Sequence, residues 1–277
     1  MTKSKRLLPW FGSNSENAPQ VGLALAGCRF VAIPFAGGMS EVPWIEAKQI
    51  LCNDRHRHVI NLCKTVASKD KRGWLIEQAD SQPYHPDVLQ EFQQIAAESV
   101  LDRHAAVPNA YAALAYFVCC WMGRGGKAGT NGELKGQLPI RWNANGGGSN
   151  QRYRTAIEAL EQWGQTFRRC EFSCLDAFEF VAKCFDTPET GIYSDSPWPD
   201  AGKEYRHRFS DDDQRRLADA LGRFQHARVV VRFGEHPLIR ELYPEPAWTW
   251  NCLSSRDQAN QVKPEFLITR NCPCATS

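Results

Sequence analysis

A short apolar run that leads into a pair of glycines limits the folds open to this chain. Phe30-Val-Ala-Ile33 reads as a buried strand, and Pro34-Phe-Ala-Gly-Gly38 follows it directly. Ser40 and Glu41 then predict the opening of a helix. A strand, a glycine turn and a helix in that order are typical of a doubly wound α/β fold. The three glycines of a dinucleotide-binding loop are absent, which disfavours a phosphate-binding loop.

Two further apolar runs end at acidic residues. Gln49-Ile-Leu-Cys52 leads to Asp54, where a carboxylate at a strand tip suits a ribose diol. Gly191-Ile-Tyr-Ser194 leads to Asp195-Ser-Pro-Trp198. An acid, a backbone carbonyl, a rigid proline and an aromatic ring in that order can hold a planar exocyclic amine, which indicates chemistry on a nucleobase. Both acids also have plain structural interpretations, as a helix cap for Asp54 and as part of an ordinary turn for Asp195.

Taken in order, these segments resemble the Dam-type, or D12-class, adenine-specific DNA methyltransferases. The resemblance extends from the first residues of the chain to nearly the last. Leu8-Pro-Trp10-Phe-Gly12-Ser-Asn14 is similar to the family's Trp-x-Gly-Gly-Lys, Ile33-Pro-Phe35-Ala-Gly-Gly38 to its Glu-Pro-Phe-x-Gly-x-Gly, Asn53-Asp54 to its ribose-binding acid, Cys170-Glu-Phe-Ser-Cys-Leu-Asp176-Ala177-Phe178 to its cofactor-adenine segment, and Asp195 to Trp198 to its catalytic Asp-Pro-Pro-Tyr. The late segments, from Tyr205-x-x-x-Phe209 to Pro264-Glu-Phe-Leu-Ile268, also follow its pattern.

The chain departs from the family at four positions. Asn14 stands where the family has lysine, and Ile33 stands where it has glutamate. Ser196 replaces the first proline but keeps the carbonyl acceptor, and Trp198 replaces tyrosine with a larger stacking face. A catalytically silent DNA-binding relative therefore stays an alternative. Transfer to cytosine N4 or to RNA stays another, because the same pair of acceptors suits each of these amines.

The resemblance implies a Rossmann-like, S-adenosylmethionine-dependent methyltransferase fold with a seven-stranded mixed sheet. It implies a discontinuous catalytic domain, residues 1–64 and 151–277, and an inserted, largely helical target-recognition region, residues 65–150. The implied reaction is direct in-line methylation of adenine N6 in double-stranded DNA after base flipping. The implied catalytic residues are Asp195, Ser196, Pro197 and Trp198, and those implied to bind S-adenosyl-L-methionine are Trp10, Phe35, Ala36, Gly37, Gly38, Asp54, Asp176, Ala177 and Phe178.

The tetrapeptide is suited to this reaction by its atoms. An adenine amine is a poor nucleophile because its lone pair is delocalised into the ring. The Asp195 carboxylate and the Ser196 carbonyl would accept its two N–H bonds and leave the lone pair directed at the methyl group. Trp198 would stack on the flipped base, a contact worth roughly 1–3 kcal/mol. Positioning then carries most of the catalysis, and no metal is required.

The insertion combines predicted helices with a basic, glycine-rich loop. Helices are expected from Pro86 to Ala105 and from Asn109 to Met122. Residues 116–154 hold six Lys or Arg against a single acid, Glu133. A solvated loop is the plain alternative, but the position of this segment in the resembling family favours a DNA-facing surface. The candidate DNA-binding residues are Arg124, Lys127, Asn131, Lys135 and Arg141.

Composition agrees with a single cytoplasmic enzyme. The 277 residues are enough for one well-buried core, and no run of eighteen apolar residues predicts a membrane span. Eleven cysteines without a framework spacing favour reduced thiols over disulfides, and Cys52, His56 and His58 lack the paired spacing of a metal site. We expect a monomer. The sequence does not determine the recognition site. It also does not determine whether a restriction endonuclease is a partner, as in restriction-modification systems.

Overall fold

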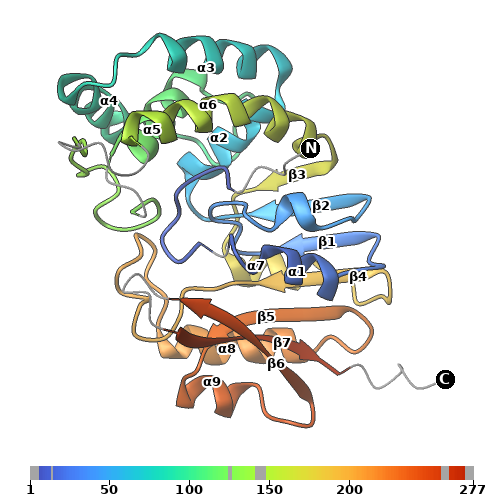
Figure 1. Ribbon diagram of the computed structural model, residues 1–277. Helices are drawn as coiled ribbons and strands as arrows, with labels where there is room; N and C mark the ends of the chain where they lie inside the picture. The colour runs from blue at the N-terminus through green and yellow to red at the C-terminus, as the bar shows by residue number, and fades with distance from the viewer. Residues whose placement is uncertain (1–5, 14, 124–126, 141–147, 257–261, 272–277) are drawn as a thin grey trace. The chain divides into compact units, whose positions relative to one another are not determined.

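The computed structural model describes residues 6–13, 15–123, 127–140, 148–256 and 262–271 (Figure 1). The chain divides into two compact units, one of residues 1–13, 37–40 and 56–174 and the other of residues 14–36, 41–55 and 175–277. The expected insertion, residues 65–150, lies within the first unit. Its expected boundaries fall inside helices α2 (Arg57–Ala67) and α6 (Ser149–Thr166), and both helices belong to the first unit.

The strands form a seven-stranded mixed sheet in the order β3-β2-β1-β4-β5-β7-β6, which confirms the expected α/β architecture. The strands are β1 (Phe30–Ile33), β2 (Gln49–Asn53), β3 (Cys170–Ser173), β4 (Thr190–Ser194), β5 (Arg228–Gly234), β6 (Trp248–Arg256) and β7 (Val262–Arg270). β1 runs parallel to β2 and β4, and β4 runs parallel to β5, whereas β7 is antiparallel to β5 and β6. The order reverses between β1 and β4, and open α/β sheets bind ligands at the carboxyl ends beside that point.

One face of the sheet in the second unit packs on three helices, α7 (Ala177–Ala182), α8 (Asp211–Gly222) and α9 (Pro237–Leu242). Val229, Val231 and Phe233 of β5 point into this core. Because side chains alternate along a strand, Arg232 lies on the opposite face. A buried arginine therefore directly follows the three buried valines of β5.

Two expected helices differ from the structure. The helix expected to open at Ser40 is wrong, because only the 3-10 turn η1 (Val42–Trp44) forms and Ile45 is extended and buried. The helix expected from residue 86 to 105 is α4 (Pro86–Glu98) and ends earlier. The carbonyls of Leu101 and Ala105 accept from Arg57 and Lys64 of α2 instead, at 2.9 and 3.0 Å, so they are satisfied without continuing the helix.

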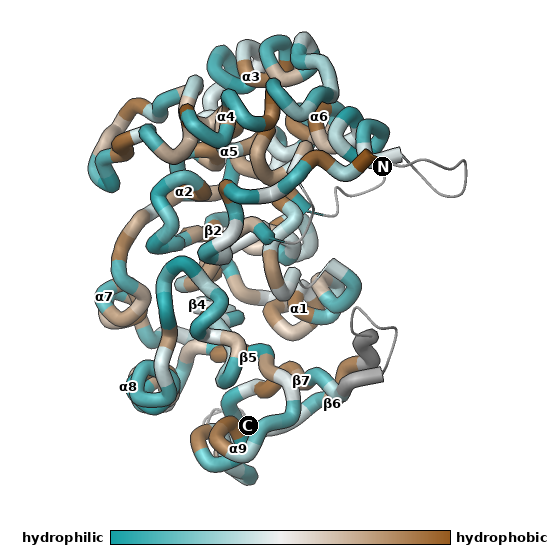
Figure 2. The backbone as a smooth tube through the Cα atoms, turned by 90° about the vertical axis from the view of Figure 1, so that its left-hand side faces the viewer, coloured by the Kyte–Doolittle hydropathy of each residue, from teal (hydrophilic) through white to brown (hydrophobic). Residues whose placement is uncertain are grey.

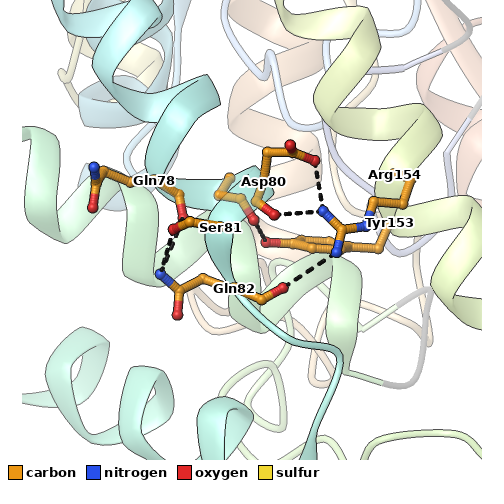
Figure 3. Close-up of polar contacts among 7 residues, drawn as sticks. Gln78, Asp80, Ser81, Gln82, Tyr153 and Arg154 are labelled. Atoms are coloured by element: carbon orange, nitrogen blue, oxygen red, sulfur yellow. Dashed lines mark hydrogen bonds and ion pairs between the residues drawn. The ribbon is translucent and has the colours of Figure 1, made fainter.

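The first unit is built mainly from α2, α3 (Lys69–Ser81), α4, α5 (Ala110–Met122) and α6. α5 is buried on almost every side, whereas α3 is largely hydrophilic in Figure 2. Figure 3 shows the end of α3 against α6: the Tyr153 hydroxyl donates to the Ala79 carbonyl at 2.7 Å, and Arg154 binds Asp80 at 2.6 Å. Within the described residues, no helix combines the length and apolar character that crossing a membrane demands.

A second contact between α3 and α6 makes Gly164 a sensitive position. A Cβ at Gly164 would lie 2.4 Å from the guanidinium of Arg72, which is itself held by Glu161 at 3.0 Å and by the Val66 carbonyl at 2.8 Å. Gly164→Ala should therefore lower the free energy of unfolding by about 1–3 kcal/mol despite the better helix propensity of alanine. Gly73→Ala on α3 is the matched control, because nothing lies within 4 Å of its added Cβ, and it should raise stability by roughly 0.5–1 kcal/mol. Urea unfolding measures both, and equal effects of the two substitutions would contradict this reading.

Candidate active site

The tetrapeptide after β4 lies beside a buried arginine of β5. Ser194 pairs with Val231, so the next residues of the two parallel strands, Asp195 and Arg232, come to the same level. The Asp195 Oδ2 atom is 2.9 Å from Arg232 Nη1, and Arg232 Nη2 is 2.7 Å from Glu265 Oε2. Neither Arg232 nor Glu265 was predicted as a site residue from the sequence. The available signal was a charged residue between three valines and a phenylalanine, since arginine is rarely buried without a partner.

Burial and charge act against each other at this cluster. Burial raises the pKa of Asp195, while Arg232 and a hydrogen bond from Trp198 oppose that shift and Glu265 adds to it. Burial would lower the pKa of Arg232, but the nearby acids Asp195 and Glu265 outweigh it and the pKa is raised. Arg232 therefore keeps its charge, and that charge favours the ionised form of Asp195.

The backbone after Asp195 is held in place by α8. Ser196 is buried, and the Gln214 side chain donates to the Pro197 carbonyl at 2.5 Å. No donor among the described residues reaches the Ser196 carbonyl. The Trp198 ring packs against Gly234, where an added Cβ would lie 2.8 Å from it, and the Arg232 guanidinium lies 5.1 Å from the ring centroid. The expected acceptor carbonyl and the expected stacking ring are thus both fixed beside Asp195.

Asn53 joins the loops that hold the expected cofactor residues of the second unit. Its Nδ2 donates to the Pro34 carbonyl at 3.0 Å and to the Leu175 carbonyl at 3.1 Å, and its Oδ1 accepts from Leu175 N at 2.9 Å. The loop after β1, the end of β2 and the start of α7 are therefore tied together. Phe35, Ala36, Asp54, Asp176, Ala177 and Phe178 all come from these loops.

The expected cofactor acids have different surroundings. Asp176 caps α7 by accepting from Phe178 N at 3.0 Å, and it forms an exposed ion pair with Arg55 at 3.7 Å. Asp54 is half-buried and does not cap α2, whose N-cap is His56. Burial and then the charges of Asp195 and Asp54 raise the pKa of Tyr205, so the acids assigned to target and to cofactor both lie near one phenol.

Aromatic rings from three segments meet in the same unit. Phe209, after the tetrapeptide loop, contacts Phe35 edge to face at 5.5 Å and stacks on Phe178 at 6.1 Å. The guanidinium of Arg216, on α8, lies over the Phe178 ring, 3.9 Å from its centroid. The two phenylalanines expected to bind the cofactor thus share Phe209 as a neighbour.

The remaining expected cofactor residues, Trp10, Gly37 and Gly38, come together in the first unit. An added Cβ would lie 2.9 Å from the Trp10 indole at Gly37, 2.8 Å from its side chain at Gly38 and 2.4 Å from its ring at Gly129. Gly37 and Gly129 also have positive φ angles of 45° and 83°. The glycine pair is therefore required by the packing of Trp10, whatever approaches it from outside.

Glu133 organises the loop that the sequence assigns to DNA. Its carboxylate is buried and accepts from His56 Nε2 at 2.8 Å, the Tyr116 hydroxyl at 2.9 Å and Gly129 N at 2.9 Å. The sequence analysis counted Glu133 only as the single acid of a basic segment. The three described candidates for DNA contact, Lys127, Asn131 and Lys135, are exposed on the same loop. Arg124 and Arg141, like Asn14, lie outside the described residues.

In the part of the chain that the structure describes, no three His, Cys, Asp or Glu side chains gather as metal ligands would. No protein-family model matches the chain, and no curated protein matches it.

Proposed function

We propose that this protein methylates the N6 amine of adenine in DNA with S-adenosylmethionine as methyl donor. The supporting observation is a group of three features beside the point where the strand order reverses: two acceptors, the Asp195 carboxylate and the Ser196 carbonyl, and the Trp198 ring. Arg232 and Gln214 hold them in place. Such a group can bind a flat base by hydrogen bonds to its amine and by stacking on its face. The nitrogen would then present its lone pair to the methyl group, and the Asp195 carboxylate would accept the proton that the amine loses.

The residues of the second unit fit the proposed donor. S-adenosylmethionine supplies an electrophilic methyl group on a positively charged sulfur. The Asp54 carboxylate suits its ribose diol, and the rings of Phe35 and Phe178 supply apolar surface beside its adenine. Tyr205 lies near both Asp54 and Asp195, so the donor side and the target side share a neighbour. These residues bind and orient, and none of them needs to form a covalent bond to the substrate.

The exposed face of the Glu133 loop supports DNA as the substrate. Lys127 and Lys135 point to solvent while the only acid of the segment is buried and bound to His56, so the outward charge is positive. Cations on an ordered loop can neutralise backbone phosphates, and Asn131 offers an amide for a base edge. This loop is therefore the proposed DNA contact of the first unit.

The double substitution Lys127→Gln/Lys135→Gln should weaken DNA binding at low salt and make it less salt-dependent. Each lost phosphate contact removes roughly 0.9 from the slope of log K against log salt, so the slope should fall by about 1.8. Fluorescence anisotropy with a labelled duplex at several salt concentrations measures this. Lys69→Gln/Lys71→Gln on α3 removes the same charge elsewhere in the unit and should keep the wild-type slope; an unchanged slope for the loop variant would exclude this loop as a phosphate contact.

The decisive experiment identifies the product. The protein is incubated with methyl-labelled S-adenosylmethionine and mixed-sequence double-stranded DNA, which is then digested to nucleosides and analysed by mass. Labelled N6-methyl-2′-deoxyadenosine supports the proposal. Labelled N4-methyl-2′-deoxycytidine, or label only in the nucleosides of a parallel RNA sample, would replace adenine in DNA by the alternative substrate. Absence of label together with DNA binding would favour the silent relative.

A further inference from the structure

Arg232 lies between two carboxylates that come from neighbouring strands. Its Nη1 donates to Asp195 Oδ2 at 2.9 Å, and its Nη2 and Nε donate to Glu265 Oε2 at 2.7 and 3.1 Å. The Arg232 side chain is 5% exposed, against 19% for Asp195 and 15% for Glu265. The planar fork of a guanidinium can hold two such partners in fixed directions, which a lysine could not do.

The strand register brings the three residues together. Ser194 pairs with Val231 across β4 and β5, so Asp195 and Arg232 follow at the same level. Glu265 of β7 pairs with Gly234, two residues beyond Arg232 on the same face of β5. Arg232 and Glu265 are therefore positioned by strands β5 and β7, and Asp195 is the residue that directly follows β4.

We propose that Arg232 is a positioning residue of the active site, which fixes the Asp195 carboxylate in one orientation and keeps it ionised for the target amine. This inference rests on the proposed function, since it concerns the residue that would accept the amine. Glu265 in turn holds the guanidinium in place. Arg232 binds Oδ2 of Asp195 and so fixes the plane of the carboxylate.

Charge is the reason why the arginine is needed. Burial and Glu265 both favour a protonated Asp195, whereas Arg232 and Trp198 favour the carboxylate. Two phenols also lie near the cluster, Tyr193 of β4, which interacts with Arg232, and Tyr205, on which Asp54 also acts. Without Arg232, two carboxylates would face each other in a buried site and one would bind a proton. A protonated Asp195 is a weaker acceptor for an N–H bond and cannot take the proton that the amine loses.

Arg232 also supports the ring expected to stack on the base. Its Cζ lies 5.1 Å from the centroid of the Trp198 ring, within the range of a cation–π contact. One guanidinium thus contacts both the acid that would hold the amine and the indole that would hold the base face.

The test measures the proton affinity of Asp195 in the free protein. Aspartate side chains are labelled with ¹³C at the carboxyl carbon, the Asp195 signal is assigned by its loss in Asp195→Asn, and its NMR shift is followed with pH. Arg232→Met should raise the Asp195 pKa by at least about one unit, a tenfold change in proton affinity. Glu265→Gln should lower it, because an opposing negative charge is removed. Arg232→Lys should return part of the wild-type value.

A pH profile of methyl transfer provides the second readout. The acid limb of kcat should move in the direction of the NMR value in each variant, while KM for S-adenosylmethionine stays unchanged. Should Arg232→Met fail to fold, Arg232→Met/Glu265→Gln removes the cation together with one acid, and its Asp195 pKa should lie above that of Glu265→Gln alone. If the Asp195 pKa is the same in the proteins with and without Arg232, the inference is overturned.

The two levels of the proposal can fail separately. The NMR titration needs no substrate, so a wild-type protein that methylates no nucleic acid refutes the proposed function while a shifted titration still supports control of Asp195 by Arg232. An active enzyme whose Asp195 titration and pH profile are the same in Arg232→Met refutes the role of Arg232 alone.

Discussion

Asp195→Asn should reduce the rate of methyl transfer to DNA by about 10²–10³-fold, the size of effect seen when one preorganised catalytic group is removed. The amide keeps the shape of the side chain and leaves Arg232 bound to Glu265 at 2.7 Å, so the sheet should stay folded. What is lost is the negative charge that would accept an N–H bond and then the released proton. Single-turnover transfer of labelled methyl groups measures the rate, and calorimetry measures S-adenosylmethionine binding, which should change little.

Asp212→Asn is the matched control for this substitution. Asp212 is exposed in the first turn of α8, where Ser210 and Asp213 form the capping box without it. It loses the same charge outside the proposed site and should keep the wild-type rate. If Asp195→Asn transfers methyl groups as fast as Asp212→Asn, the acceptor role of Asp195 is wrong.

Glu133→Ala should lower the free energy of unfolding by about 3–5 kcal/mol, as expected when a buried acceptor is removed and three buried donors lose their partner. The substitution takes the acceptor away from His56, Tyr116 and Gly129 together. It also loosens the loop that carries Lys127 and Lys135, so DNA affinity should fall as well. The midpoint of urea unfolding and DNA anisotropy measure the two effects.

Two further variants separate hydrogen bonding from charge at this position. Glu133→Gln keeps one oxygen acceptor and should lose only about 1–3 kcal/mol. Glu158→Gln on the exposed side of α6 removes a charge of the same kind from the same unit and should stay within about 0.5 kcal/mol of the wild type. A Glu133→Ala protein as stable as Glu158→Gln would show that the buried contacts of Glu133 contribute nothing.

Elements whose signals are local could be predicted from the sequence. The apolar runs correctly predicted β1, β2 and β4 within a few residues, and the run from Asn109 to Met122 correctly predicted α5. The helix expected at Ser40 failed, because the chain there turns into the core at Ile45. α1, α3, α6 and β6 were not predicted. Their patterns are weaker, and packing against neighbours decides them.

The candidate site divides along the same line. The sequence was enough to predict strands that lead to Asp54 and Asp195, because an apolar run followed by a carboxylate is a local pattern. The contacts that hold the site and its surroundings join distant positions: Arg232 is 37 residues beyond Asp195, Leu175 is 122 beyond Asn53, and Glu133 is 77 beyond His56. Such contacts depend on strand register and helix packing. The role of a buried charge can be assigned only when the group that neutralises it is known. Tertiary structure alone therefore decided how each acid is held.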